Sequence, residues 1–379
     1  MSGGLAIDEL LAGSPDQGKV RAFLEGRKVP LVEGSSVTFL WEGQADGVSL
    51  RHWIYGLESS TSLVRVQNTD LWYLRLDIPH GSRVEYKYEI HRGGGSSWIE
   101  DPLNPNRARD PFGANSVLQG EGYQAPPWSN FDPTARPGAL EPFAFDSQAL
   151  GRRNGLLYFP ARFRRTRQYP LLVVHDGSDY VNYASMKTIL DNLIHRLEIP
   201  DLIVAFTDSP DRLREYANNQ AHARFLTDEL VPDLAKRLPL IDRPQARGLM
   251  GASFGAVAAF STAYRTPGFW GRLLLQSGSF AFTDIGTHNR RGPLFDGVVE
   301  FVNAYRKEPK AVSERVFMSC GVYESLIYEN RTMLPLLSAT GMEVRLVEAR
   351  DGHNWENWRD RLREGLSWLF PGPLLFIYE

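Results

Sequence analysis

The hydrophobic period of the chain changes near residue 146, and this change constrains the fold more than any other feature. Before it, between residues 37 and 118, apolar and polar residues alternate in segments rich in Val, Tyr and Trp, separated by turn residues. These segments are 37–41, 48–56, 72–78 and 84–92. Alternation of this kind without a long helical pattern is typical of antiparallel strands. We therefore expect a small sandwich of the immunoglobulin-like kind, preceded by a short helix at 18–26.

After residue 146, strand patterns alternate with helical patterns. The expected strands are 156–162, 169–177, 202–208, 246–251, 272–278, 316–321 and 343–349. The expected helices are 186–197, 222–238, 254–265 and 356–370. Strands that alternate with helices form a parallel sheet covered on both faces. The fold class is therefore α/β, with a sandwich domain at 1–130 and an α/β domain at 131–379, joined by a proline-rich ordered linker.

The composition excludes several classes of protein and site. With 42 basic and 45 acidic residues among 379, the net charge is −3, so no global field attracts nucleic acid or an anionic membrane. No apolar run reaches the length of a membrane-spanning helix, and the first residues lack the basic start of a signal peptide. The single cysteine, Cys320, can form neither an internal disulfide nor a cysteine-based metal site. We expect a cytoplasmic protein without a metal or cofactor.

The segment 251–255 carries the sharpest chemical signal. It reads Gly-Ala-Ser-Phe-Gly and lies between an expected strand and an expected helix, which is the context of a nucleophile elbow. The tight turn requires small neighbours and exposes the serine oxygen beside the positive end of the helix. Ser253 is therefore the predicted nucleophile, and the alternative is a packing turn whose serine only caps the helix.

A serine nucleophile needs a base, and the base needs a carboxylate to orient it. His353 lies after the last expected strand and before the last helix, the place of the base in the α/β-hydrolase fold. Glu324 is the first carboxylate after strand 316–321 and is the predicted acid. Glu329 is its rival, whereas Asp351 is too near the base in sequence to reach round to Nδ1 easily.

The negatively charged oxygen of the intermediate needs two preorganised N–H donors. We expect one from Phe254, the residue after the nucleophile. The other is expected from the loop 175–180, where Gly177 lets the backbone turn and directs the Ser178 N–H inward. Four side chains near these segments are predicted to contact the substrate: Arg214, Tyr216, Tyr180 and Trp355.

Taken together, these motifs resemble the enterochelin esterase branch of the serine esterase family. In the second domain they are HDGSDY, RLREYA, MGASFGAV, LLLQSGSF, CGVYE and DGHNWENWR, and in the first they are FLWEGQA, VEYKYEI and DPLNPN. The resemblance implies an α/β-hydrolase that cleaves the ester bonds of ferric catecholate siderophores, small molecules from which iron is then released. It also implies a triad of Ser253, Glu324 and His353.

Two other functions fit part of these signals. One is an esterase or acyl transferase acting on a feruloyl or acetyl sugar, with the first domain as a carbohydrate-binding module. Its sugar platform would be a pair of exposed aromatics, for which Trp41, Trp53 and Trp98 are the candidates. The other is a non-catalytic binding protein on a hydrolase scaffold, which the intact elbow, acid and base disfavour.

Overall fold

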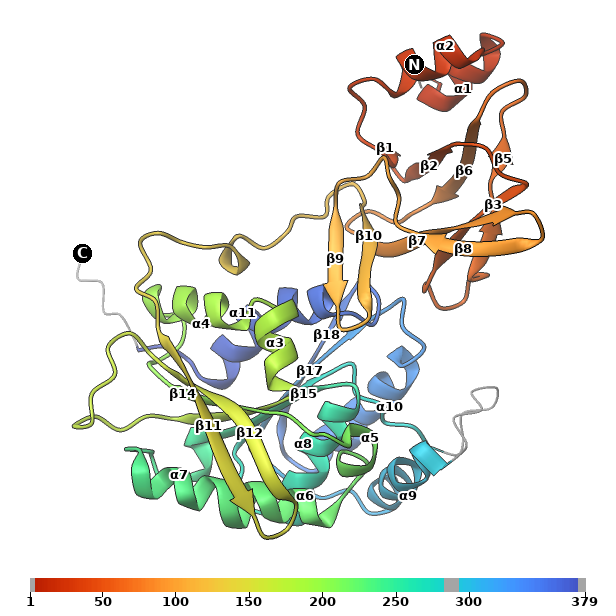
Figure 1. Ribbon diagram of the computed structural model, residues 1–379. Helices are drawn as coiled ribbons and strands as arrows, with labels where there is room; N and C mark the ends of the chain where they lie inside the picture. The colour runs from red at the N-terminus through yellow and green to blue at the C-terminus, as the bar shows by residue number, and fades with distance from the viewer. Residues whose placement is uncertain (1–3, 283–292, 374–379) are drawn as a thin grey trace. The chain divides into compact units, whose positions relative to one another are not determined.

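The computed structural model describes residues 4–282 and 293–373, which form two compact units (Figure 1). The first unit contains residues 4–125 together with the short segments Val322–Glu324 and Ala349–Gly352. The second contains the rest of the described chain, from Pro126 onward. This division falls at 125/126, and the domain boundary at 130/131 stays a prediction.

The first unit holds two antiparallel sheets. One sheet has the order β1 (Leu31–Glu33), β2 (Ser36–Glu42), β6 (Leu71–Asp77), β5 (Val64–Arg65). The other has the order β4 (Ser60–Ser62), β3 (Gly47–His52), β7 (Arg83–Arg92), β10 (Gly113–Gln119), β9 (Arg107–Asp110), and β8 (Gly95–Ile99) also pairs with β7. Two short helices come first, α1 (Ala6–Ala12), which the sequence analysis missed, and α2 (Gln17–Leu24).

Alternating residues of the two sheets form the core of the first unit. Val37 and Phe39 come from β2, and Tyr86 and Tyr88 come from β7. Asp101 is fully buried beside them and accepts a hydrogen bond of 2.6 Å from the Tyr86 hydroxyl. Burial raises the pKa of the Asp101 carboxyl, and the hydrogen bond from Tyr86 opposes part of that rise.

The second unit is built on one eight-stranded sheet. Its order is β11 (Ala139–Ser147), β12 (Gly151–Phe159), β14 (Ile203–Thr207), β13 (Leu171–His175), β15 (Arg247–Ala252), β16 (Arg272–Gln276), β17 (Arg315–Gly321), β18 (Glu343–Ala349). The β11–β12 hairpin is antiparallel and joins the sheet through β14, and the strands from β14 to β17 are parallel. The mixed α/β architecture expected from the sequence is confirmed.

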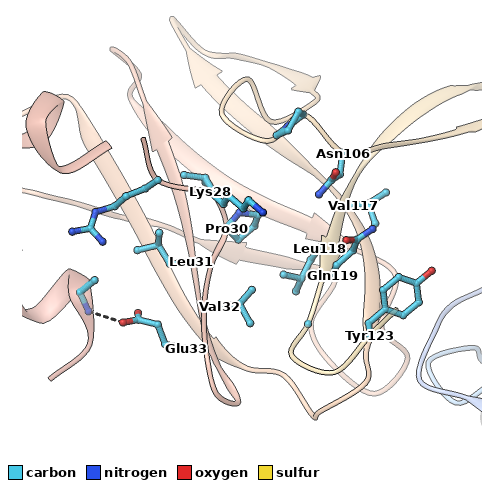
Figure 2. Close-up of a pocket in the computed structure, with 15 residues that line it drawn as sticks. Lys28, Pro30, Leu31, Val32, Glu33, Asn106, Val117, Leu118, Gln119 and Tyr123 are labelled. Carbon is cyan, nitrogen blue, oxygen red and sulfur yellow. Dashed lines mark hydrogen bonds between the residues drawn. The ribbon is translucent and has the colours of Figure 1, made fainter. Parts of the chain in front are cut away.

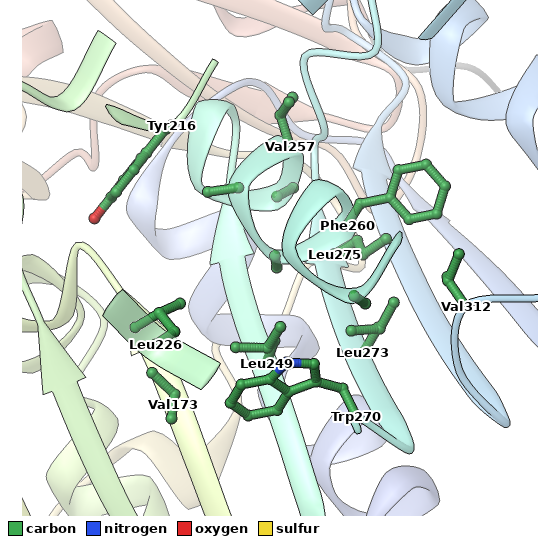
Figure 3. Close-up of a cluster of buried hydrophobic side chains, with 14 of the residues drawn as sticks. Val173, Tyr216, Leu226, Leu249, Val257, Phe260, Trp270, Leu273, Leu275 and Val312 are labelled. Atoms are coloured by element: carbon green, nitrogen blue, oxygen red, sulfur yellow. The ribbon is translucent and has the colours of Figure 1, made fainter. Parts of the chain in front are cut away.

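Helices cover both faces of this sheet (Figure 1). They are α3 (Gly177–Tyr183), α4 (Met186–His195), α5 (Arg212–Glu215), α6 (Gln220–Arg224), α7 (Val231–Arg237), α8 (Phe254–Arg265), α9 (Pro293–Lys307), α10 (Ile327–Ser338) and α11 (Trp355–Leu369), with 3₁₀ turns at Pro127–Ser129 and Pro244–Ala246. Side chains of β13 alternate between the faces: Leu172 and Val174 pack with α3, α4 and α11, whereas Leu171 and Val173 pack with α6 to α10. Figure 3 shows the second of these cores, around Leu249 and Phe260.

One expected helix differs from the structure. The helix predicted over 222–238 is three segments, with a π-helical turn at Phe225–Leu230 between α6 and α7. Pro232 lies in the first turn of α7, where its missing N–H costs little. The apolar pattern alone does not reveal the wider π turn, because it changes the hydrogen-bond partner rather than the residue type.

Candidate active site

Ser253 occupies a strained turn between β15 and α8. Its backbone angles are φ 57° and ψ −120°, a region that costs a residue with a side chain about 1–3 kcal/mol. The turn brings Gly251 against Gly255 so closely that a Cβ on Gly251 would lie 2.4 Å from the Gly255 carbonyl carbon. Only glycine fits at position 251, so the elbow predicted from the sequence is confirmed as a local structure.

The Ser253 hydroxyl is partly exposed and has one polar neighbour, the hydroxyl of Ser279 at 3.2 Å. The Ser253 N–H donates to Gln276 O at the end of β16, which fixes the turn to the neighbouring strand. Phe254 is the first residue of α8, so its N–H is one of the donors that a helix leaves unused in its first turn. Its predicted part in stabilising an oxyanion stays a prediction.

His353 lies in the loop between β18 and α11, and its side chain is exposed. The imidazole meets the Trp358 ring edge-on, with ring centroids 5.0 Å apart and planes at 90°. Trp358 is itself anchored, because its Nε1–H donates to Ser277 Oγ at 2.9 Å. The indole therefore presents a fixed wall to one side of the imidazole.

The three carboxylates considered for the acid are all buried. Glu324 lies in the turn between β17 and α10, and Glu329 lies in the first turn of α10. Asp351 accepts hydrogen bonds from Arg83 Nη1 at 3.2 and 3.3 Å and from the Gly352 N–H at 2.7 Å. These bonds occupy the Asp351 carboxylate, and the choice of Glu324 over Glu329 as the partner of the base stays a prediction.

The loop expected to complete the oxyanion hole runs directly into a helix. α3 begins at Gly177, immediately after β13 and Asp176. The Ser178 N–H, the predicted donor, is already paired with Asp208 Oδ1 at 3.0 Å. The Ser178 N–H is therefore already engaged in this structure, and the donor that this loop supplies stays a prediction. Burial and the charges of Asp176 and Asp208 raise the pKa of nearby Asp179 to about 6.

Two of the predicted substrate contacts, Tyr180 and Tyr216, are both fully buried, which argues against that role. The Tyr180 hydroxyl donates to Gln276 Oε1 at 2.8 Å, and the Tyr216 hydroxyl accepts from the Asp176 N–H at 3.3 Å. Both phenols are structural, because their hydroxyls bind protein groups and the packed core surrounds their rings.

The other two predicted contacts stay predictions. Arg214 is exposed on α5, and its neighbour Glu215 pairs with Arg153 at 2.5 Å instead. Trp355 is half-buried, and its ring meets the Trp358 ring edge-on at 4.8 Å. Both side chains keep a solvent-facing surface that a ligand could contact.

A buried pair of histidines is hydrogen-bonded to β15. His175 Nδ1 donates to Met250 O at 2.8 Å, and its Nε2 lies 3.0 Å from His222 Nε2. Because His175 uses its proton on the carbonyl, its Nε2 must accept from His222. Burial lowers the pKa of His175 to about 4 and also lowers the pKa of His222. Both rings are therefore neutral at pH 7.

Sequence reasoning missed three polar residues of this region: Asp176, Arg212 and Asp208. Asp176 has left-handed backbone angles, and Arg212 forms a salt bridge with it at 2.8 Å. Asp176 and Asp208 each follow a strand and Arg212 begins α5, so no local motif links the three. The only local signal is their position, since Asp176 and Asp208 each directly follow a buried parallel strand.

The first unit has its own pocket of about 700 Å³, with Leu31, Leu118 and Tyr123 among its lining residues (Figure 2). Of the candidate sugar-platform aromatics, Trp41 is buried, whereas Trp53 and Trp98 are half-exposed. Within residues 4–282 and 293–373, no group of three acidic, histidine or cysteine side chains could hold a metal. No helix in the same residues is long and apolar enough to cross a membrane.

Comparisons with known proteins agree with the fold and show the family of the chain. A family described as putative esterase matches residues 147–369. The iron(III) enterobactin esterase of Dickeya dadantii is 26% identical over 397 residues, covering 90% of each chain. The enterobactin esterase of Shigella flexneri, solved in the presence of enterobactin, superimposes with a TM-score of 0.73 at 20% identity, covering 92% of this chain and 97% of that one. A ferulic acid esterase structure gives a TM-score of 0.55 at 18% identity and covers 64% of this chain but 98% of its own.

Proposed function

Because the chain belongs to the esterase family, we propose that it hydrolyses the ester bonds of a ferric catecholate siderophore, with Ser253 as the nucleophile. The protein is a carboxylic ester hydrolase, as its sequence predicts. The proposal concerns the substrate, the triad and the compartment. It includes a cytoplasmic location, since a chain with one cysteine suits a reducing environment.

The observation that supports a siderophore as the substrate is the share of this chain that the similar proteins cover. The enterobactin esterases match this chain across both units, at 90% of its length or more in the two comparisons given above. The ferulic acid esterase matches 64% of the chain, although nearly all of its own length is covered. A first unit shared with siderophore esterases therefore favours the siderophore over a feruloyl sugar.

In the proposed mechanism, Ser253 Oγ attacks the ester carbonyl while His353 removes its proton. Glu324 holds the imidazole in one tautomer and stabilises the imidazolium. The imidazolium then protonates the leaving alkoxide, which departs as an alcohol, and the acyl group remains on Ser253. Water, deprotonated by the same imidazole, attacks the acyl-enzyme and releases the acid.

The negative charge that develops on the carbonyl oxygen needs preorganised donors. Phe254 supplies one N–H at the positive end of α8, and the first turn of α3 supplies the other. Arg214 and Trp355 are the side chains proposed to contact the anionic, aromatic substrate. The immunoglobulin-like character of the two antiparallel sheets is also part of the proposal.

A panel of three esters tests the substrate. We expect kcat/KM for a ferric tricatecholate triester to exceed that for a feruloyl sugar by about 10²-fold, which corresponds to about 3 kcal/mol of transition-state binding. p-Nitrophenyl butyrate serves as the reference ester, and Ser253→Ala reports background hydrolysis. A higher kcat/KM for the feruloyl sugar would contradict the siderophore and support the carbohydrate esterase.

A further inference from the structure

Asp176 joins β13 to α3 in an unusual conformation. Its angles are φ 52° and ψ 43°, in the left-handed region that residues other than glycine, asparagine and aspartate rarely adopt. Its N–H donates to the Tyr216 hydroxyl at 3.3 Å, and its side chain is buried. This turn follows β13 and starts α3 at Gly177, so the position of Asp176 affects where the N–H groups in the first turn of α3 lie.

The Arg212 guanidinium holds the Asp176 carboxylate through several contacts. Nε donates to Oδ1 at 2.8 Å and to Oδ2 at 2.9 Å, and Nη2 lies 2.8 Å from Oδ2. The same Nη2 donates to Ala252 O at 3.3 Å. Ala252 directly precedes Ser253, so one guanidinium connects the turn before α3 with the nucleophile elbow.

The two turns also approach each other without Arg212. A Cβ on Gly255 would lie 3.3 Å from Asp176 Oδ2 and 3.3 Å from His175 Cβ. The first turn of α8 is therefore packed against the carboxylate that Arg212 holds. A shift of Asp176 would change the distance between the first turns of α3 and α8, which carry the proposed oxyanion donors.

We propose that Arg212 and Asp176 form a positioning pair that fixes the spacing of the two oxyanion donors. The inference rests on the proposed function of Ser253, but it does not depend on which ester is the substrate. Arg212 binds Asp176 and Ala252, so it acts through the backbone geometry of both turns. A misplacement of about 1 Å in such donors lowers turnover by about 10²-fold.

The test compares Arg212→Gln, Arg212→Lys and Asp176→Asn with wild type. Arg237→Gln is the matched control, because it removes an arginine from an exposed helical ion pair with Asp233. With p-nitrophenyl butyrate we expect kcat of Arg212→Gln to fall about 10²-fold while KM changes less than about 3-fold. A boronic acid that forms a tetrahedral adduct on Ser253 should lose affinity by the same factor. The lysine variant should recover little, because an ammonium lacks the planar fork that bridges carboxylate and carbonyl.

A merely structural role predicts a different pattern. It would lower the melting temperature and the amount of active enzyme without weakening the boronic acid in the folded fraction. Millimolar guanidinium should restore part of kcat in Arg212→Gln if the cavity is intact and the missing group is the bridge. Unchanged kcat and boronate affinity in Arg212→Gln would overturn the proposal, as would a rise in KM alone, which would indicate a substrate contact.

The rate at which a fluorophosphonate labels Ser253 separates this inference from the proposed function. If wild type is labelled and hydrolyses p-nitrophenyl butyrate but not a ferric tricatecholate, the substrate is wrong and the positioning pair is still measured. If wild type is not labelled at Ser253, both proposals fail. We expect labelling of Arg212→Gln to slow by about 10²-fold, because the phosphoryl oxygen uses the same donors.

Discussion

The nucleophile elbow and the loops that carry the acid and base are held by different parts of the chain. The elbow is fixed by the close approach of Gly251 and Gly255, by β16 and by Arg212. These residues all belong to the second unit. The segments Val322–Glu324 and Ala349–Gly352 group instead with the first unit.

Specific hydrogen bonds account for that grouping. Tyr323 O accepts from the Tyr55 N–H at 2.8 Å, and the Tyr323 hydroxyl lies 2.6 Å from Ser82 Oγ. The Arg83 N–H donates to Arg350 O at 2.9 Å. Residues next to the proposed acid and base are thus held by hydrogen bonds within the first unit, whereas the residues that fix the nucleophile elbow belong to the second. Changes in the first unit should therefore affect proton transfer more than the nucleophile itself.

The largest effect is expected at the elbow. Ser253→Ala removes the attacking oxygen, and kcat should fall by up to about 10⁶-fold, as in serine proteases. Ser261→Ala is the control on the same helix, since Ser261 Oγ bonds only one turn back, to Ala258 O. Steady-state ester hydrolysis with both variants measures the difference. Appreciable turnover by pure Ser253→Ala would exclude the elbow serine as nucleophile.

The second effect concerns the loop after β17. Glu324→Gln keeps the shape of the side chain but removes its charge, so kcat should fall by about 10²–10⁴-fold with little change in KM. Glu329→Gln and Asp351→Asn are the comparison variants, each checked for folding by its melting temperature. Full activity in Glu324→Gln, with inactivity in one of the others, would transfer the role of acid to that residue.

The third effect tests an ion pair within the first unit. Arg83 is fully buried and pairs with Asp351, whose side chain is 6% exposed. Arg83→Met removes the cation that Asp351 and Glu85 share, and the buried Asp351 carboxylate loses this partner, which costs about 3–5 kcal/mol of stability. Hydrogen exchange should show lost protection in 322–324 and 349–352 but unchanged protection in α8.

A double-mutant cycle with Asp351→Asn completes that test. The double variant should be less destabilised than the sum of the single variants, because the uncompensated charge is gone. Equal loss of protection in α8 would mean that the elbow also depends on the first unit. The elbow and the segments 322–324 and 349–352 would then not differ in what holds them.

The smallest expected effect is a pH dependence of the free energy of unfolding, which arises from His175 beside the strand that precedes the elbow. His175 has a pKa of about 4 in the folded chain, whereas an unfolded histidine titrates near 6.5. Between these values the unfolded state binds more protons, so the free energy of unfolding falls as the pH drops from about 6.5 to 4. His175 alone contributes up to about 3 kcal/mol to that fall.

Thermal unfolding between pH 4 and 7 measures this dependence. His222→Gln keeps a donor for His175 Nε2 and removes one titrating ring, so its stability should depend less on pH than that of wild type. The control is His195→Gln, which changes an exposed imidazole. The same pH dependence in His222→Gln and wild type would mean that the buried pair does not titrate with unfolding.

The sequence predicts those features that short segments determine. The elbow is such a feature, because Gly251, Ser253 and Gly255 are adjacent and their strand and helix flank them directly. The alternation of strands and helices likewise predicts the architecture of the second unit, since each element has its own period. His353 and Glu324 are predicted from their order after the strands, without any contact being known, and their roles stay predictions.

The sequence could not predict the features that depend on contacts between distant segments of the chain. Tyr180 lies in α3 and Tyr216 directly follows α5, and only the packed structure shows that core residues surround them. The Ser178 N–H is paired with a carboxylate 30 residues away. Asp176 and Arg212 are 36 residues apart, and neither has a local pattern that marks it as one half of a pair.

Because His353 meets Trp358 edge-on, the intrinsic fluorescence of Trp358 can report on the imidazole. The anchored indole lies 5.0 Å from the imidazole, and a charged imidazolium quenches indole fluorescence. The chain has nine tryptophans, so the signal of Trp358 is taken as the difference in emission between wild type and Trp358→Phe. This difference follows the charge on the His353 imidazole. In a stopped-flow experiment, that difference would time the proposed transfer of the proton from Ser253 to His353 without a chromogenic substrate.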